Sequence, residues 1–94
     1  MILRCNMKLH GEFVLRQIVD ETVAVPVGQT SLEFNGMILL NDVSKVIWQA
    51  LEQETDLAGL VARITDTFEV SAQEAEADIL EFLSQLRQAQ LLEE

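Results

Sequence analysis

The sequence holds one cysteine, one histidine and one proline. The scarcity of cysteine and histidine limits disulfide formation and metal binding. Cys5 has no partner for an internal disulfide. With His10 it provides two metal ligands, whereas a zinc site uses four protein ligands, or three and a water. We therefore expect no metal site, no cofactor and a reduced thiol, as in cytoplasmic proteins.

Long apolar runs are also absent. None approaches the roughly 20 residues that span a bilayer. The first residues lack the basic start and the continuous apolar stretch of a signal peptide. We therefore expect a cytoplasmic protein with no membrane partner.

Basic residues are scarce: six stand against sixteen acidic ones, for a net charge of −10. The imbalance is uneven, because residues 1–45 carry a net −1 and residues 46–94 carry −9. A protein that binds nucleic acid without sequence preference needs a basic face to replace counterions, and this chain has none. An anionic membrane surface is disfavoured for the same reason.

The apolar residues, 49% of the chain, suffice for one small domain over residues 1–94, with 1–11 expected to be a less ordered arm. Alternating and β-branched residues predict strands near 13–19 and 22–27, joined by a tight turn at Asp20-Glu21. Met37-Ile38-Leu39-Leu40 follows Asn35-Gly36, which favours a turn, and predicts a third strand at 37–40. Whether residues 32–34 pair with it stays open.

Helical spacing fills the second half. We expect helices near 43–52, 57–68 and 72–90, capped by Asn41-Asp42, Thr55-Asp56 and Ser71, the last with a capping box to Glu74. Leu91-Leu92 should pack back onto the core. Strands followed by helices predict an α+β domain, a winged-helix-like three-stranded antiparallel sheet with a three-helix unit.

No residue set predicts catalysis. Glu74, Asp78 and Glu81 share one side of the last helix, but a solvated face explains them better than an acid–base pair, which needs burial. Ser44 lacks the sequence context of a phosphopantetheine-bearing serine. We therefore expect a protein that is not an enzyme.

Leu80 and one strand indicate binding instead. Leu80 falls about 120° from the apolar stripe of its helix at 100° per residue, so it should be at the core's edge or exposed. Trp48 should be partly buried at the core's edge. The 37–40 strand has no charge or proline to protect an exposed edge, which makes it a place to add a peptide strand.

These segments resemble the PqqD-like family, small proteins related to the D component of pyrroloquinoline quinone biosynthesis. Phe34-Asn35-Gly36-Met37-Ile38-Leu39-Leu40-Asn41 and then Val46-Ile47-Trp48-Gln49-Ala50-Leu51 are similar to the strand-to-helix segment of that family. The run from Glu76 to Leu86 with Leu91-Leu92 is similar to its ending. The chain departs from the family pattern at two places. Ala89-Gln90 stands where the family frequently has a glycine, and Asn41-Asp42-Val43-Ser44 replaces the usual Asn-Glu-Thr/Ser-Gly/Ala.

The resemblance implies a non-catalytic peptide-recognition module. Such domains bind the leader of a ribosomally made precursor peptide by strand addition and present it to a modifying enzyme, often a radical SAM protein. The residues it implies for peptide binding lie on the third strand and the last helix: Met37, Ile38, Leu39, Leu40, Asp78, Ile79, Leu80, Leu83, Ser84 and Arg87. The module would act as a monomer or a homodimer.

Two alternatives stay open at this point. One is a winged-helix-like regulatory domain, although DNA binding is disfavoured because the last helix carries Arg87 against Glu74, Glu76, Asp78 and Glu81. The other is a subunit that only scaffolds an enzyme complex.

Overall fold

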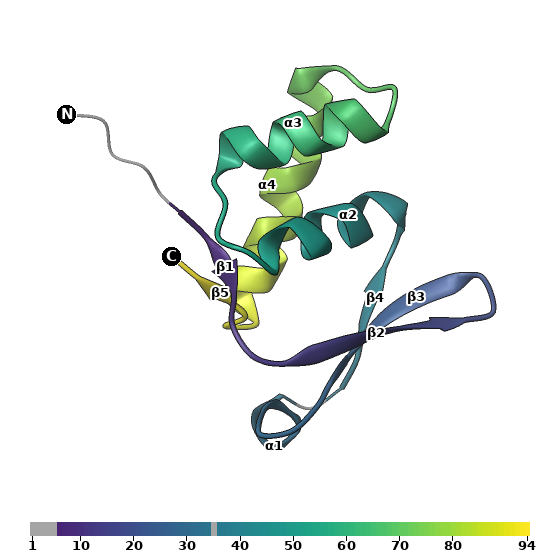
Figure 1. Cartoon of the computed structure of the whole chain (residues 1–94), viewed down its shortest axis with the longest axis vertical. Coiled ribbons are helices and arrows are strands. Elements are labelled where there is room, and N and C mark those ends of the chain that lie inside the picture. Colours follow the sequence, from purple (N-terminus) through teal and green to yellow (C-terminus); the bar gives the residue numbers. More distant parts are fainter. Residues whose placement is uncertain (1–5, 35) are drawn as a thin grey trace.

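A computed structural model describes residues 6–34 and 36–94 (Figure 1). In chain order these residues form β1 (Lys8–Leu9), β2 (Phe13–Ile18), β3 (Glu21–Pro26), α1 (Thr30–Glu33), β4 (Ile38–Leu40), α2 (Asp42–Leu51), α3 (Leu57–Thr67), α4 (Ala72–Gln88) and β5 (Leu92–Glu93). Cys5 and Asn35, which the sequence singled out, lie outside the described residues. The chain is α+β as predicted, and its sheet-then-helices order is compatible with a winged-helix-like arrangement.

The main sheet is an antiparallel meander in the order β2-β3-β4, as expected. Val23 pairs with Arg16 on one side and with Leu39 on the other. Alternation gives the sheet two different faces. The face toward the helices carries Ala24 and Leu40, which are buried in the core, whereas Leu39 is exposed on the other face.

The turn between β2 and β3 lies one residue earlier than the sequence indicated. Ile18 pairs with Glu21, so the two-residue loop is Val19-Asp20 and Glu21 already belongs to β3. Val19 has φ 58°, a conformation that a β-branched residue rarely adopts. The sequence indicated the wrong position because Asp and Glu are polar residues that suit a turn, whereas the β-branched Val19 favours a strand. The pairing register of β2 and β3 places Val19 in the turn nevertheless.

Residues 32–34 form no strand. The segment is the helical turn α1, in which the Phe34 N–H donates to the Thr30 carbonyl at 2.8 Å. Gly28 has φ 59°, and its carbonyl accepts from the Ser31 hydroxyl at 2.7 Å, so the chain bends before α1. The turn sets the ring of Phe34 edge-on to Phe13, with 5.7 Å between centroids. Gly36 has φ 125°, the positive φ expected of the turn before β4.

Residues 7–10 belong to the fold rather than to a less ordered arm. Met7 is buried and exchanges backbone hydrogen bonds with Thr55. Lys8 and Leu9 form β1, which pairs antiparallel with β5 near the C-terminus (Figure 1). The His10 N–H donates to the Leu91 carbonyl at 2.8 Å. Strands of two residues carry too little periodicity to be read from sequence.

The three main helices begin at the cap residues that the sequence predicted. Asn41, Asp56 and Ser71 are the N-cap residues of α2, α3 and α4, and each side chain accepts a backbone N–H of the first turn. The buried face of α2 includes Trp48, which is 2% exposed and lies edge-on to Phe13 at 5.2 Å. The expectation that Trp48 is only partly buried was therefore wrong, because Trp48 is part of the core and Phe13 of β2 packs against its ring.

The end of α4 forms a Schellman motif. The Leu91 N–H donates to the Leu86 carbonyl and the Gln90 N–H to the Arg87 carbonyl, with Gln90 at φ 62°. The motif turns the chain so that Leu91 is buried and Leu92 packs against the core, as expected. The helix end is therefore well defined, although glutamine stands at the position that glycine favours.

Gln90→Gly should raise the free energy of unfolding by about 1 kcal/mol, because glycine adopts positive φ without the steric cost of a Cβ. Ala77→Gly, at an exposed position inside α4, is the matched control and should lower it by a similar amount. Urea denaturation followed by circular dichroism measures both. A loss of stability in Gln90→Gly would show that Gln90 does not take this conformation.

Candidate functional site

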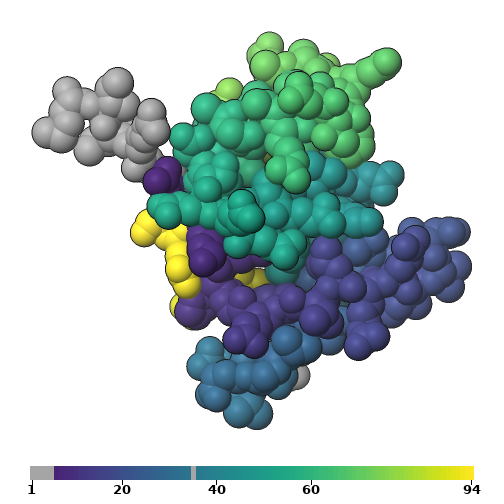
Figure 2. Space-filling model, in the orientation of Figure 1, coloured from purple at the N-terminus to yellow at the C-terminus, as the bar shows by residue number. Residues whose placement is uncertain are grey.

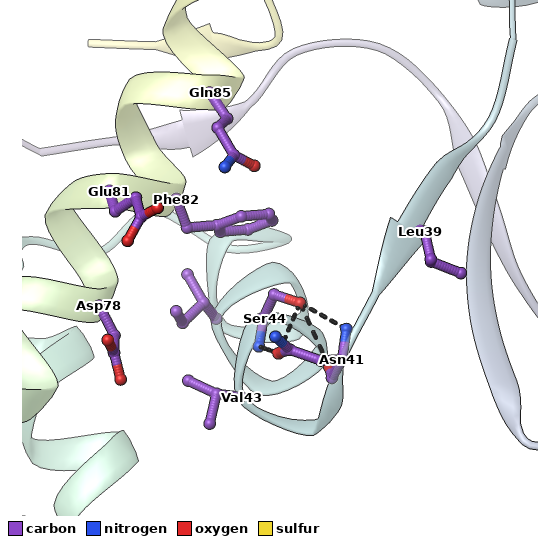
Figure 3. A pocket seen from close by; sticks show the side chains of 9 residues that line it. Leu39, Asn41, Val43, Ser44, Asp78, Glu81, Phe82 and Gln85 are labelled. Atoms are coloured by element: carbon purple, nitrogen blue, oxygen red, sulfur yellow. Dashed lines mark hydrogen bonds between the residues drawn. The ribbon is translucent and has the colours of Figure 1, made fainter.

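A groove of about 270 Å³ lies between β4, α2 and α4 (Figure 3). Residues from all three parts of the chain line it: Leu39 and Asn41 at β4, Val43, Ser44 and Ile47 of α2, and Asp78, Glu81, Phe82 and Gln85 of α4. The groove therefore joins the sheet edge to the helix face, the two features that sequence and resemblance had paired.

The floor of the groove is apolar and closely packed. Ile47 is 1% exposed and Phe82 is 7% exposed, and both belong to the main core, while Val43 is partly buried. Sequence places them there because Val43 and Ile47 are one helical turn apart on α2. A ligand in the groove would rest on this floor without entering the core.

A capping box holds the corner where β4 becomes α2. The Ser44 N–H donates to Asn41 Oδ1 and the Asn41 N–H donates to Ser44 Oγ, both at 2.8 Å (Figure 3). These polar groups satisfy one another, so they fix the start of α2 beside the strand. Ser44 is buried in this role, which gives it a structural task in place of the carrier function that its context had already disfavoured.

The rim of the groove on α4 is polar and acidic. Asp78, Glu81 and Gln85 are exposed and recur at helical spacing on one side of the helix. None of the lining residues is cationic. Within residues 6–34 and 36–94 the ion pairs are His10 with Glu93 and Arg87 with Glu94, so neither carboxylate has a cationic partner there.

The edge of β4 beside the groove has no pairing strand in the part of the chain that the structure describes. β3 occupies the other edge through Ala24, Val23 and Thr22. Ile38-Leu39-Leu40 contains no charge and no proline, the features with which proteins protect exposed edges. Leu39, 61% exposed, points away from α4 (Figure 3).

The structure brings together only part of the residue set that the resemblance implied. Asp78 lines the groove, Leu39 borders it with its side chain turned away from α4 (Figure 3), and the exposed Met37 lies next to β4. Ile38 packs against the core, and Leu40, Ile79 and Leu83 are buried in it. Those four side chains are therefore structural in the chain as it stands.

The other three implied residues of α4 lie away from the groove. Leu80, 48% exposed as expected for an edge position, is about 150° around the helix from the middle of the groove-lining side at 100° per residue. Ser84 and Arg87 are on the same far side. Arg87 donates to Glu94 at 2.6 and 3.2 Å, and these hydrogen bonds hold the pKa of the Glu94 carboxyl below its usual range.

Sequence reasoning did not single out Glu81, Phe82 and Gln85 as groove residues. Glu81 was interpreted only as one of three solvated carboxylates. The available signal was their i, i+3, i+4 and i+7 spacing from Asp78, which places all four on one side of α4. The direction from which β4 approaches α4 is a tertiary feature, so the sequence did not show which side mattered.

Outside the groove, the described residues hold few candidates for chemistry. No group of three or more His, Cys, Asp or Glu side chains among them is placed to hold a metal ion. His10 forms a hydrogen bond with Glu93 at 2.9 Å. No helix within residues 6–34 and 36–94 is long and apolar enough to cross a membrane.

A family model for coenzyme PQQ synthesis protein D (PqqD) matches residues 21–92, most of the 94-residue chain. The chain belongs to the PqqD family. The matched region begins with β3 and ends in β5, so it contains the β4 edge and every residue that lines the groove. No curated protein and no solved structure matches the chain.

Membership in the PqqD family confirms the resemblance that the sequence motifs indicated. It links the chain to the synthesis of coenzyme PQQ, in which protein D is an accessory component rather than a catalyst.

Proposed function

We propose that this PqqD-family chain is a cytoplasmic, non-catalytic peptide-binding module. It holds the leader of a ribosomally made precursor peptide as an added strand on the β4 edge and presents the peptide to a modifying enzyme of the radical SAM class. The observation that carries the proposal is the uncharged edge of β4, which lies beside a groove long enough to be lined from Asp78 to Gln85.

Main-chain pairing alone would be too weak for this task. β4 has three residues, so an added strand gains about two or three main-chain hydrogen bonds, worth about 0.5–1.5 kcal/mol each. A micromolar complex needs about 8 kcal/mol. Side-chain contacts must supply the remainder, which is why the edge and the groove beside it are proposed to work as one site.

The proposal predicts a precursor-peptide gene and a radical SAM gene beside the gene for this chain, and binding of that precursor's leader tests it. A dye-labelled leader should bind saturably in fluorescence anisotropy, while a scrambled peptide of the same composition should not. The neighbouring radical SAM enzyme should modify its precursor far more slowly when this chain is omitted. Equal modification with and without the chain, together with no leader binding, would refute the proposed function.

The variant Leu80→Glu tests which side of α4 contacts the peptide. Leu80 is half-exposed and outside the groove, so this variant should fold and bind the leader with unchanged affinity. Loss of binding in a folded Leu80→Glu protein would place the peptide on the far side of α4, with the anchor near Leu80 and Leu83 that the resemblance first implied.

A further inference from the structure

We propose that the groove selects a leader segment in which a lysine or arginine stands two residues from an apolar side chain, with the cationic group between Asp78 and Glu81. This inference rests on the proposed function and names the chemistry of its ligand. It follows from what the floor and the rim of the groove still expose.

The floor contributes little selectivity. Ile47 and Phe82 are already almost fully covered by the chain's own core, so a ligand gains little new apolar contact from them. Val43 is the floor residue with surface left to cover. A single apolar side chain of the peptide, placed over Val43, therefore covers the apolar surface that the floor still exposes.

The rim is where peptides can be distinguished. Asp78 and Glu81 are both exposed, both line the groove and have no cationic partner within residues 6–34 and 36–94 (Figure 3). Gln85 continues the same side of α4 without charge. A carboxylate on the peptide would be repelled here, whereas an ammonium or guanidinium group would gain two partners.

The spacing follows from strand geometry. Side chains of an added strand alternate between the two faces of the sheet, and only every second one points toward α2 and α4. The apolar residue over Val43 and the basic residue at Asp78 and Glu81 both need that direction. The nearest positions that share it are two residues apart.

The surrounding surface favours the same ligand. On the face that Figure 2 shows, the first half of the chain lies mainly at the bottom and the second half mainly at the top, and α4 belongs to the second half, which carries a net charge of −9. Such a field attracts basic peptides over a Debye length of about 8–10 Å and should make association salt-dependent.

A library of random twelve-residue peptides displayed on phage tests this inference. Selection on the wild-type chain should enrich Lys or Arg two positions from an apolar residue. Selection on Asp78→Lys/Glu81→Lys should enrich Asp or Glu at that position instead. The matched control is Glu69→Lys/Glu76→Lys, which makes the same change of net charge at exposed residues outside the groove.

The best wild-type peptide, synthesised and titrated, should bind the groove variant about tenfold or more weakly and the control variant within about threefold. Exchanging its basic residue for glutamate should restore affinity to the groove variant. Equal weakening in both variants, or selected peptides without a basic preference, would overturn the inference while leaving the proposed function intact. Absence of binding by the leader itself to the wild-type chain would count against the proposed function as well.

Discussion

Trp48→Ala should lower the free energy of unfolding by about 3–5 kcal/mol. Trp48 is 2% exposed, and its ring packs edge-on to Phe13 with 5.2 Å between centroids. The substitution removes the largest buried side chain and leaves a cavity between β2 and α2 that neighbouring residues can fill only in part. Because domains of this kind are stable by only about 5–15 kcal/mol, the variant should be close to its unfolding threshold.

Urea denaturation followed by circular dichroism measures this loss, since Trp48 is the only tryptophan and its fluorescence disappears with it. Leu32→Ala is the control. Leu32 is an exposed apolar residue on α1, so its truncation should change stability by no more than about 0.5 kcal/mol. A loss below about 1 kcal/mol in Trp48→Ala would mean that α2 does not pack against β2 as described.

The main elements could be predicted because their signals are local. The cap residues Asn41, Asp56 and Ser71 and the helical spacing of Leu60 and Ile64 fix the helices without reference to the rest of the chain. The three strands of the sheet were found in the same way, each bounded within two residues. Local signals also gave the fold class, through the order of strands and helices.

The errors lie where tertiary contacts overrode a local signal. The Val19-Asp20 turn follows from the β2 to β3 register and not from the chemistry of its residues. The open question whether residues 32–34 pair with the third strand was likewise decided by tertiary structure, because the turn α1 packs Phe34 against Phe13. Two-residue strands such as β1 depend on a partner at the other end of the chain. Trp48 is buried because β2 reaches it, which helical spacing cannot show.

The candidate site combines a strand edge that is visible in the sequence with a helix side that is not. The β4 edge was recognised because its lack of charge and proline is visible in four consecutive residues. The sequence and the resemblance indicated Leu80, Ser84 and Arg87 on α4, whereas the groove beside β4 is lined by another side of that helix, because the facing strand is not visible in the sequence. The groove residues Asp78, Glu81 and Gln85 emerge only when β4 and α4 are seen together.

N-methylated leader peptides test strand addition most sharply, because they change the ligand and leave the protein intact. In an added strand, alternate backbone N–H groups point toward the neighbouring strand and the others point away. A methyl group on a donating nitrogen removes its hydrogen bond and leaves an acceptor of β4 unpaired. An unpaired buried acceptor costs about 1–3 kcal/mol, or roughly tenfold or more in affinity.

Two versions of the leader, methylated on the odd or on the even nitrogens across the segment that binds, should therefore differ. Isothermal titration against the wild-type chain should show one version losing affinity by about tenfold or more and the other staying within about threefold of the unmodified leader. Both versions carry the same methyl groups and the same stiffening, so only hydrogen-bond direction separates them. Equal affinities for the two versions would contradict strand addition at the β4 edge.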